Sequence, residues 1–350
     1  TISYKVELFK SGSTTAVSTQ TVSGLSYDFA SAIRQAGAGT YTFKVTAISS
    51  SATNANNSAT ATSGNLYAVS VSVTAGTGIA TATINGSSSY VMINGESVTV
   101  SYTTKTGYAL ASITSSDANR LTMSNTTATL LANITTTGAI TITVAGYAKG
   151  YTVTFNGNNG TLTNQTSLNL TYNGSSYSSI ASHVSATRTG YQLTGWFDKA
   201  TGGNMIWDAN GDGVKGTYWS EVPSKGGKWQ YAGNVTAYAH WSVITYTITY
   251  NLNGGSATNP TTYTIETATF TLNTPTKAGY TFAGWTGSNG TTAQKTVSIA
   301  KGSTGNKTYT ANWTANTYNI TFNTDGGSTI ANSTYTTSTS AITKSLGTPT

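Results

Sequence analysis

The strongest candidate for a chemical site in this sequence is a stretch that reads Asp-Ala-Asn-Gly-Asp-Gly from position 208 to 213. Oxygen-bearing side chains at alternate positions can converge on one hard cation, and a glycine permits the sharp turn that this convergence needs. The spacing is typical of the start of a calcium-binding loop. It predicts a calcium site whose ligands are the side chains of Asp208, Asn210 and Asp212 and the carbonyl of Val214.

The end of this loop departs from the pattern. A loop of this kind closes on a bidentate Glu at its twelfth position, which in this chain is Trp219, and the nearest acid is Glu221, two residues later. We take Glu221 as the fifth candidate ligand. The alternative is an Asx-rich turn that is stabilised by its own side chains and holds no cation. The sequence leaves both interpretations open.

Three tryptophans surround the same stretch, at Trp207, Trp219 and Trp229. A tryptophan combines a large apolar face with a polar N–H, and exposed aromatic faces can stack on sugars. These three rings are therefore a candidate platform for a ligand. Unlike the other four tryptophans of the chain, they do not recur at matching positions. The alternative is that they form the small core of this stretch.

The chain is not expected to be an enzyme. It has two histidines, His183 in a Ser-rich loop and His240, which we expect to face solvent. It has no cysteine, so thiol chemistry and cysteine-ligated zinc are excluded. The sequence contains no Gly-x-Ser-x-Gly elbow, phosphate-binding loop or His-Glu-x-x-His motif.

Composition favours several small β-rich units. Only 8% of the residues are charged, against about 25% in an ordinary globular domain, but 22 Tyr, 7 Trp and 8 Phe supply apolar surface for several cores. The net charge is +7, yet the basic residues are scattered without a run of three, which argues against a nucleic-acid partner. No apolar run approaches the ~20 residues of a membrane helix, so we expect no membrane insertion of this segment.

Internal repeats dominate the second half of the chain. Three segments open alike: Tyr-Thr-Val-Thr-Phe-Asn at 151–156, Tyr-Thr-Ile-Thr-Tyr-Asn at 246–251 and Tyr-Asn-Ile-Thr-Phe-Asn at 318–323. The strict alternation predicts a half-buried β-strand in each. A turn of Asn and Gly residues follows each strand, and we expect positive φ angles there. These turns are at 159–160, 254–255 and 326–327.

Two further signatures complete the repeat. Gly-Tyr-Gln-Leu-Thr-Gly-Trp at 190–196 matches Gly-Tyr-Thr-Phe-Ala-Gly-Trp at 279–285, and Ala-Tyr-Ala-His-Trp at 237–241 matches Tyr-Thr-Ala-Asn-Trp at 309–313. We expect the four tryptophans that recur here to form the cores of the repeats. A divergent copy lies upstream, with alternating valines at 69–73, Gly-Tyr-Ala-Leu-Ala-Ser-Ile at 107–113 and a closing strand at 139–144.

These signatures resemble the internalin-type B-repeat, also called the Listeria–Bacteroides repeat. The family pattern is a Tyr-Thr-Val-Thr-Phe strand, an Asn-Gly-Gly turn, a Gly-Tyr-x-Phe-x-Gly-Trp strand and a closing Tyr-Ala-x-Trp strand. The resemblance covers residues 151–313 and extends in weaker form over 67–150. It implies small β-grasp-like modules in large bacterial surface proteins, where such modules serve as stalks or in adhesion rather than as catalysts.

The first 64 residues differ from the repeats. Alternating residues at 2–8 and 41–48 predict two strands. Between them, Asp28 is a candidate cap of a short helical turn that carries Phe29 and Ile33 on one side. This arrangement resembles the later strands of a fibronectin type III-like sandwich.

The predicted fold is mainly β, a tandem array of small β-grasp-like repeat modules after a partial β-sandwich. Its parts are an N-terminal segment with the fibronectin type III-like pattern (1–64), module 1 as the divergent copy (65–150), module 2 with the Asp/Asn/Gly-rich insertion (151–243), module 3 (244–315) and module 4 (316–350). Module 4 is expected to be incomplete, because Ser345–Thr350 aligns with Thr271–Thr276, after which module 3 continues to Trp285.

The sequence therefore favours a non-catalytic structural or adhesive stalk segment of a large secreted bacterial protein, located outside the cell at the cell surface or cell wall. Its expected partners are neighbouring modules of the same chain, a host, matrix or glycan ligand, and further copies of itself in a filament. Calcium is the one candidate cofactor, with an Asx-rich turn that holds no cation as the alternative. Two other classes stay open: an accessory or carbohydrate-binding region of a secreted multidomain enzyme, and a subunit of an extracellular filament or surface layer.

Overall fold

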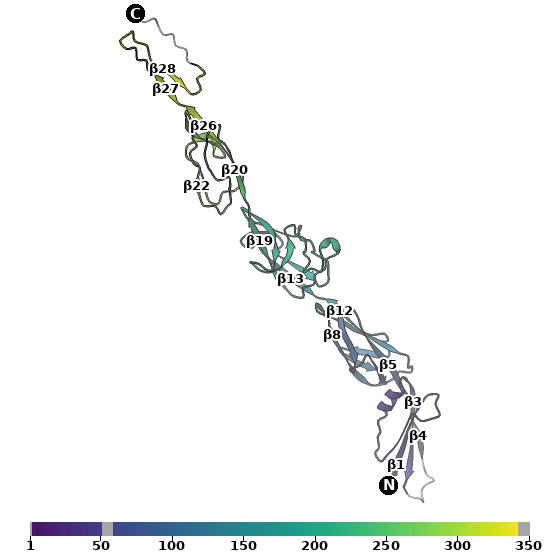
Figure 1. The fold of residues 1–350 in the computed structure, drawn as a ribbon. Helices are drawn as coiled ribbons and strands as arrows, with labels where there is room; N and C mark the ends of the chain where they lie inside the picture. The colour runs from purple at the N-terminus through teal and green to yellow at the C-terminus, as the bar shows by residue number, and fades with distance from the viewer. Residues whose placement is uncertain (1, 51–58, 342–350) are drawn as a thin grey trace. The chain divides into compact units, whose positions relative to one another are not determined.

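The computed structural model describes residues 2–50 and 59–341. Its regular structure is almost entirely β, which confirms that the fold is mainly β (Figure 1). The described residues also form one α-helix, α1 (Ala30–Ala36), and one 3-10 helix (Pro223–Lys225). Within this part of the chain, no helix is long and apolar enough to cross a membrane. The chain divides into two compact units, unit 1 with residues 1–153, 167–178 and 213–235, and unit 2 with residues 154–166, 179–212 and 236–350.

In unit 1, the N-terminal segment is an antiparallel sheet with α1 packed against it. Its strands are β1 (Ile2–Lys10), β2 (Ser18–Val22), β3 (Gly39–Ser49) and β4 (Thr60–Thr62), with β1 between β2 and β3. Phe29 and Ile33 are buried in one cluster with Tyr41 of β3. The predicted helical turn is confirmed, but its N-cap is Phe29, whose side chain makes no capping hydrogen bond. Asp28 lies one residue earlier, and its Oδ1 accepts a hydrogen bond from the N–H of Ala30 at 2.7 Å.

The fibronectin type III-like sandwich is not confirmed in this segment. Its described residues (2–50 and 59–64) contribute to a single sheet, and a helix rather than a second sheet completes the hydrophobic cluster. The sheet also continues past residue 64, because β3 pairs with β5 (Leu66–Ala75). Ala68 of β5, opposite Gly39, belongs to the cluster of the N-terminal segment.

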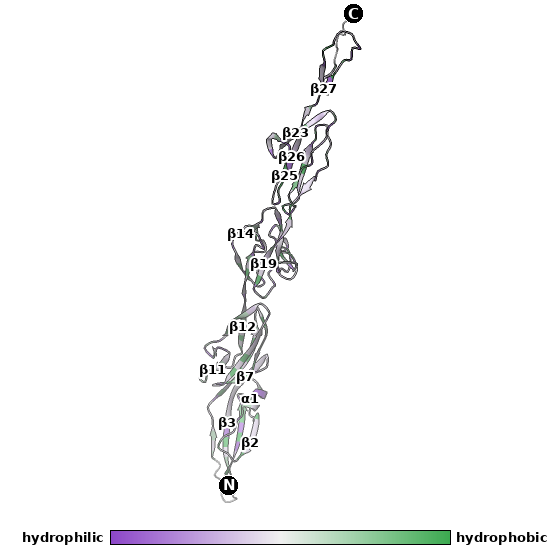
Figure 2. Ribbon diagram, turned by 90° about the vertical axis from the view of Figure 1, so that its left-hand side faces the viewer, coloured by the Kyte–Doolittle hydropathy of each residue, from purple (hydrophilic) through white to green (hydrophobic). Residues whose placement is uncertain are grey.

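Module 1 contains two sheets with a core between them. β7 (Ser89–Ile93), β9 (Tyr108–Ser115) and β12 (Ile140–Ala148) join β5 in the first sheet, while β6 (Ile79–Ile84), β8 (Ser97–Thr104), β10 (Leu121–Ser124) and β11 (Thr127–Leu130) form the second. Val69 and Val71, which alternate along β5, are fully buried in one cluster with Ile84 and Val100 of the second sheet. Hydrophobic residues, green in Figure 2, accordingly lie along the strands.

Modules 2 and 3 consist of strands that repeat one order. The strands are β13 (Gly150–Asn156), β15 (Ser167–Thr171), β17 (Tyr191–Phe197), β18 (Met205–Asp208), β19 (Val235–Val243), β20 (Tyr246–Asn251), β21 (Thr262–Tyr263), β23 (Tyr280–Gly287), β24 (Gly290–Gln294) and β26 (Lys307–Ala315). The orders are β15-β13-β19-β17-β18 and β21-β20-β26-β23-β24, and module 1 has β7-β5-β12-β9. In all three modules, the first strand lies beside the last, and the last lies beside the strand of the Gly-Tyr signature.

The register of these strands also repeats. First and last strands pair in parallel between β5 and β12 and between β20 and β26. The last strand pairs antiparallel with the Gly-Tyr strand in every module, and the register skips one residue, which is Ala111, Thr194 or Ala283. Each skipped residue lies four positions after the glycine of the Gly-Tyr signature. Module 1 therefore shares strand order and bulge position with the two clearer copies.

A turn follows the first strand of modules 2, 3 and 4 as predicted, but it lies one residue earlier than expected, and Gly160, Gly255 and Gly327 do not have positive φ. The two central residues of each turn have positive φ: Asn158 47° and Asn159 69°, Asn253 48° and Gly254 80°, Asp325 44° and Gly326 90°. Two successive positive φ angles are typical of a type I′ turn, which joins twisted antiparallel strands without splaying them. In each turn, the following residue donates its N–H to the carbonyl at the start, at 2.8, 2.9 and 2.8 Å.

The remaining strands form two-stranded sheets. They are β14 (Thr161–Asn164) with β16 (Val184–Thr187), β22 (Phe270–Thr271) with β25 (Ser298–Ile299), and β27 (Thr317–Ile320) with β28 (Ser333–Thr336). In module 4, Tyr318 lies opposite Tyr335, with ring centroids 5.3 Å apart. Ser345–Thr350, on which the incomplete repeat was predicted, lies outside the described residues. A β-grasp-like arrangement of the modules is not confirmed.

Candidate functional site

The predicted calcium loop forms a tight turn at the end of β18. Oδ1 of Asp208 accepts hydrogen bonds from the N–H groups of Asn210 and Asp212, both at 2.9 Å. The N–H of Asp208 donates to the carbonyl of Asp212, also at 2.9 Å. Asn210 and Asp212 are exposed, whereas Asp208 is half-buried. These internal hydrogen bonds are those of an Asx-type turn, the alternative that the sequence left open beside calcium binding.

The other two candidate ligands, Val214 and Glu221, belong to unit 1. Oε2 of Glu221 accepts a hydrogen bond from Nζ of Lys215 at 2.8 Å. This bond from Lys215 holds the pKa of the Glu221 carboxyl below its ordinary value, so the carboxylate already has a cationic partner. Over residues 2–50 and 59–341, no cluster of three or more acidic or histidine side chains is placed to hold a metal ion. Calcium binding stays a prediction from the sequence.

Two of the three candidate platform tryptophans lie in a small aromatic cluster in unit 1. Trp219 and Trp229 are both 0% exposed, and their rings meet edge to face with centroids 5.4 Å apart. Tyr218 and Tyr231 lie beside Trp229, with centroids 5.5 and 6.3 Å away. Stacking on a sugar needs an exposed ring face. The faces of these rings are buried among one another.

The third, Trp207, is also 0% exposed and lies in unit 2. It belongs to β18, and its ring centroid is 5.6 Å from that of Phe155 on β13. Phe155 in turn meets Trp196 edge to face at 5.0 Å. All three tryptophans therefore occupy interior positions, and a ligand platform made from them would require the insertion to open.

The four tryptophans that recur in the repeats have two different roles. Trp196 and Trp285 are 1% and 0% exposed, so the expectation that they form cores is confirmed. Trp241 and Trp313 are only half-buried. Their indole Nε1 atoms each donate a hydrogen bond of 3.0 Å to the carbonyl that opens the type I′ turn of their own module. Trp313 also packs against the core of module 3, where its ring meets that of Phe282 with centroids 5.6 Å apart, so it joins the edge of the core as well as holding the turn.

The histidines are placed by sheet pairing. His240 is half-buried: its ring stacks on Phe197 with centroids 4.0 Å apart, and its Nε2 lies 2.8 Å from the carbonyl oxygen of Lys199. The pairing of β19 with β17 brings this part of the two strands together. Nδ1 of His183 lies 3.0 Å from Oγ of its sequence neighbour Ser182.

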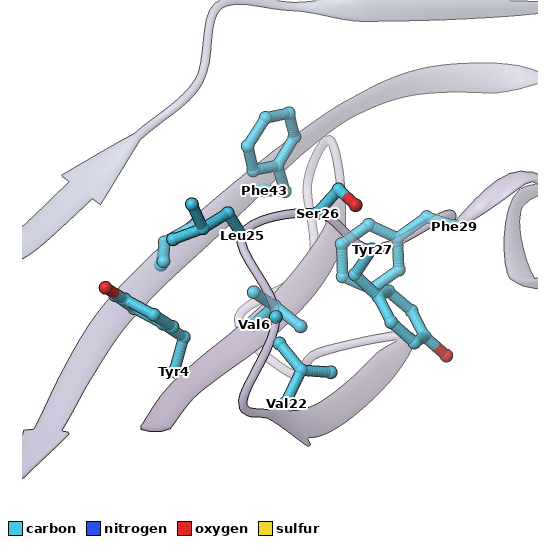
Figure 3. Close-up of a pocket in the computed structure, with 10 residues that line it drawn as sticks. Tyr4, Val6, Val22, Leu25, Ser26, Tyr27, Phe29 and Phe43 are labelled. Carbon is cyan, nitrogen blue, oxygen red and sulfur yellow. The ribbon is translucent and has the colours of Figure 1, made fainter. Parts of the chain in front are cut away.

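A pocket that the sequence did not predict lies in the N-terminal segment (Figure 3). It has a volume of about 350 Å³ and is lined mainly by apolar side chains. β1 contributes Tyr4 and Val6, β3 contributes Phe43, and the loop after β2 contributes Leu25 and Tyr27. Leu25 is 93% exposed. The one signal available in the sequence was this pair of large apolar residues in a loop otherwise rich in Gly and Ser.

Comparison with known proteins identifies the repeats. A sequence model of the Listeria-Bacteroides repeat domain matches residues 151–222 and 246–312. Internalin H of Listeria monocytogenes is 32% identical over 106 residues, which make up 30% of this chain and 16% of that protein. A protein of Evansella cellulosilytica, described as a Gly-rich membrane protein, is 26% identical over 184 residues, 52% of this chain and 18% of that protein. The matches thus span less than a fifth of either relative.

The two matched segments agree with the repeated strands. Each contains the first strand of its module and the Gly-Tyr strand, β13 and β17 in the first segment and β20 and β23 in the second. The first match ends at residue 222, inside the insertion, so that the closing strand β19 lies beyond it. Two segments of the chain, in modules 2 and 3, are therefore similar to the Listeria-Bacteroides repeat domain.

Proposed function

We propose that this chain is a non-catalytic structural segment of a bacterial cell-surface protein, whose modules space and present other parts of that protein outside the cell. The observation that carries the proposal is how directly one module follows another. β12 ends at Ala148 and β13 begins at Gly150; β19 ends at Val243 and β20 begins at Tyr246. Connections of one or two residues leave no room for a flexible linker. Such connections suit a chain whose work is mechanical.

We further propose a fold for the modules and an adhesive surface in the N-terminal segment. The modules are β-grasp-like, supported by mixed sheets in which the first and last strands pair in parallel. The antiparallel pairing of β1 with β2 and β3 supports a fibronectin type III-like relationship of the N-terminal segment, in which α1 takes the place of a second sheet. The adhesive surface is the apolar pocket of that segment, which leaves Leu25 almost fully exposed for contact with a host, matrix or glycan ligand.

Location is tested on whole cells of the source bacterium. An antibody raised against the full chain should label intact cells as strongly as permeabilised ones. Labelling that appears only after permeabilisation would overturn the surface location. Mass and terminal sequences of the native polypeptide add a second readout, because a catalytic domain in the same polypeptide would make this chain an accessory region of a secreted enzyme instead.

Adhesion is tested with the full chain on immobilised matrix proteins and a glycan array. Leu25→Asp should abolish binding, since a carboxylate at the mouth of the pocket opposes burial of an apolar ligand. Ile48→Asp is the matched control, because Ile48 is 38% exposed in the same segment but does not line the pocket. Equal binding by both variants would show that the pocket is not the adhesive surface.

Sedimentation velocity of the full chain distinguishes a filament or surface-layer subunit, which would self-associate.

A further inference from the structure

One turn of identical construction recurs at the Gly-Tyr signature of modules 1, 2 and 3. It reads Lys-Thr-Gly-Tyr at 105–108, Arg-Thr-Gly-Tyr at 188–191 and Lys-Ala-Gly-Tyr at 277–280. In each, the tyrosine N–H donates to the carbonyl of the basic residue, at 3.1, 3.0 and 3.1 Å. The glycine has φ of 79°, 76° and 77°, a conformation that L residues with a Cβ rarely adopt. We call this element the socket turn.

A second turn recurs in the module that follows each socket turn. It comes directly after the strand that lies beside the module's first strand, and its first carbonyl accepts the N–H three residues later. We call it the plug turn. The plug turns are residues 171–174 in module 2, 264–267 in module 3 and 336–339 in module 4, with hydrogen bonds of 2.9, 3.1 and 2.9 Å.

The second residue of each plug turn lies over the glycine of the preceding socket turn. These pairs are Tyr172 over Gly107, Ile265 over Gly190 and Thr337 over Gly279. A Cβ added at Gly190 would lie 2.6 Å from Cδ1 of Ile265, and one added at either of the other glycines would overlap its partner in the same way. A glycine is therefore required at this position for two reasons: the positive φ angle, and the lack of space for a Cβ beneath the side chain of the plug turn.

The backbone closes the same contact. A residue one or two positions before the first strand of the next module donates its N–H to the carbonyl of the socket glycine: Lys149 to Gly107 at 2.8 Å, Ile244 to Gly190 at 2.9 Å and Asn316 to Gly279 at 2.9 Å. The socket glycine is thus held from two sides, by the start of the next module at its carbonyl and by the plug at its α-carbon.

Side chains beside the plug differ from one joint to the next. At the first, Tyr172 meets Tyr108 edge to face at 5.6 Å. At the second, the hydroxyl of Tyr191 donates to Oε1 of Glu266 at 2.5 Å. At the third, Oγ1 of Thr337 donates to the carbonyl of Gly279 at 2.8 Å. The backbone frame is common to all three joints, whereas the chemistry around it is local.

The insertion of module 2 supports the first plug turn. The N–H of Asn173 donates to the carbonyl of Trp229 at 2.7 Å, and the N–H of Trp229 donates to the carbonyl of Gly174 at 2.9 Å. Trp229 belongs to the buried aromatic cluster of the insertion. Two hydrogen bonds therefore fix the plug turn to the buried aromatic cluster. The cluster, the plug turn and the socket turn of module 1 all belong to unit 1.

Module 1 uses its corresponding turn in a related way. The turn at 93–96 follows β7, and its last residue, Glu96, donates its N–H to the carbonyl of Ile93 at 2.9 Å. The partner here is α1 of the N-terminal segment: Arg34 and Glu96 form an ion pair with the nitrogen and oxygen 2.5 Å apart. The turn after the strand beside the first strand thus contacts the preceding part of the chain at all four junctions. In module 1 the contact is made by the fourth residue of this turn, Glu96, and in the other modules by the second.

We propose that the Lys/Arg-x-Gly-Tyr turn of this repeat is a docking socket, and that the partner it fits is a β-turn presenting one side chain at its second position, supplied by the following module. Each joint restrains the two modules that share it. The repeat signature would then specify two things, the core of its own module and the attachment of the next. This inference does not depend on the cellular location proposed above.

The full chain offers a direct test, because it has no cysteine and accepts a pair of spin labels at introduced cysteines. Thr201→Cys in module 2 and Thr292→Cys in module 3 place the labels at exposed sites on either side of the second joint. Pulsed electron resonance between them should show one narrow distance peak. Gly190→Ala and Ile265→Asp should each cause loss of that peak, whereas Ile265→Val should retain it.

Gly202→Ala is the matched control for backbone strain. Gly202 also has positive φ, 63°, but no atom lies within 4 Å of the position that a Cβ would take. It should keep the narrow peak. A broad distribution in the parent chain would overturn the proposal, and so would a narrow peak retained by Ile265→Asp, a variant that leaves the glycine turn intact. Loss of the peak in Gly202→Ala would assign the effect to strain and overturn it as well.

Discussion

Modules 2 and 3 have the same strand order and the same signatures, yet they fill the space beside their first strand differently. In module 3 the ring of Tyr250 on β20 stacks on Tyr309 of the closing strand, with centroids 6.1 Å apart. Module 2 has Phe155 at the first of these positions and Ala237 at the second. The ring beside Phe155 is instead Trp207, which comes from the insertion.

The edge strand of each sheet, β18 in module 2 and β24 in module 3, shows how Trp207 comes to lie beside Phe155. β18 pairs with β17 so that Trp207 lies opposite Trp196, and β24 pairs with β23 so that Gln294 lies opposite Trp285. The two edge strands therefore occupy equivalent places. Gln294 is exposed, whereas Trp207 is fully buried. Module 2 has the small Ala237 on its closing strand where module 3 has Tyr309, and the ring of Trp207 on the edge strand fills the corresponding volume. Such an exchange keeps the core closely packed.

Removal of the Trp207 ring should have the largest effect on stability. Trp207→Ala should destabilise module 2 by about 3–5 kcal/mol, because it opens a cavity beside Phe155. Tyr309→Ala should cost module 3 a similar amount and leave module 2 unchanged. Hydrogen exchange of the full chain, read by mass spectrometry on peptides from each module, separates the two effects.

A rescue variant sharpens this prediction. Ala237→Tyr in the Trp207→Ala background restores a ring at the position that Tyr309 has in module 3, and it should recover part of the lost protection. If Trp207→Ala leaves the exchange of module 2 unchanged, the insertion is not part of the core. If Ala237→Tyr gives no recovery, the two rings do not occupy the same space.

Alkaline pH should separate the two modules next. Burial, with a further contribution from Tyr309, raises the pKa of Tyr250 to about 12, from its ordinary value of 10.0. A raised folded-state pKa means that this stabilisation is fully present below pH 10 and is lost as the pH rises towards 12. Burial also raises the pKa values of Tyr263 and Tyr309. Module 3 should therefore lose stability in this range.

Module 2 is the internal control, because it carries Phe155 where module 3 has Tyr250. Exchange protection measured from pH 8 to 11 should fall earlier in module 3 than in module 2, after correction for the intrinsic exchange rate. Tyr250→Phe should move module 3 towards the behaviour of module 2. A parallel fall in both modules would show that the buried hydroxyls do not set the alkaline limit.

The Asp208 turn has no counterpart in module 3 and should give a smaller effect. Asp208→Ala removes the acceptor for two backbone N–H groups and should destabilise module 2 by roughly 1 kcal/mol. Asp208→Asn keeps one side-chain oxygen and should be milder. Thermal unfolding of the full chain and its variants measures both changes.

Calcium titration decides what else this turn does. If the predicted site binds calcium, isothermal titration of the full chain at millimolar calcium should release or absorb heat, and Asp208→Asn should abolish the signal. Absence of heat would leave the Asx turn as the whole explanation of the motif. Glu221→Gln tests the proposed last ligand, because it should weaken calcium binding only if this carboxylate leaves Lys215 to bind the cation.

The smallest effect is expected at the joint between these modules. The hydrogen bond from Tyr191 to Glu266 raises the pKa of the tyrosine, so its contribution is fully present below pH 10 and is lost as the phenol ionises above that value. Tyr191→Phe should leave the stability of both modules unchanged and broaden the label distance only slightly. Broadening as large as that of Ile265→Asp would transfer the main role at this joint from the plug to the hydroxyl.

Local features of the sequence were sufficient to predict much of the fold. Alternation from Tyr246 to Asn251 predicted a strand because side chains on a strand point to opposite faces in turn. The Asn/Gly pairs predicted turns with positive φ, to within one residue, because few residues accept such angles. Phe29 and Ile33 predicted a short helical turn for a similarly local reason. The Asp208 motif was recognised as a turn, but its chemistry was left open, because one spacing serves both a cation and backbone N–H groups.

By itself, then, the sequence determined the alternating strands and the tight turns that follow them, since these depend on neighbours a few residues apart. Only the tertiary structure decided which distant residues meet. It placed Trp207 beside Phe155, set His240 against Phe197 and brought Ile265 over Gly190. Such contacts join residues that are tens of positions apart, and they depend on the strand order of a whole sheet and on where one module ends against the next.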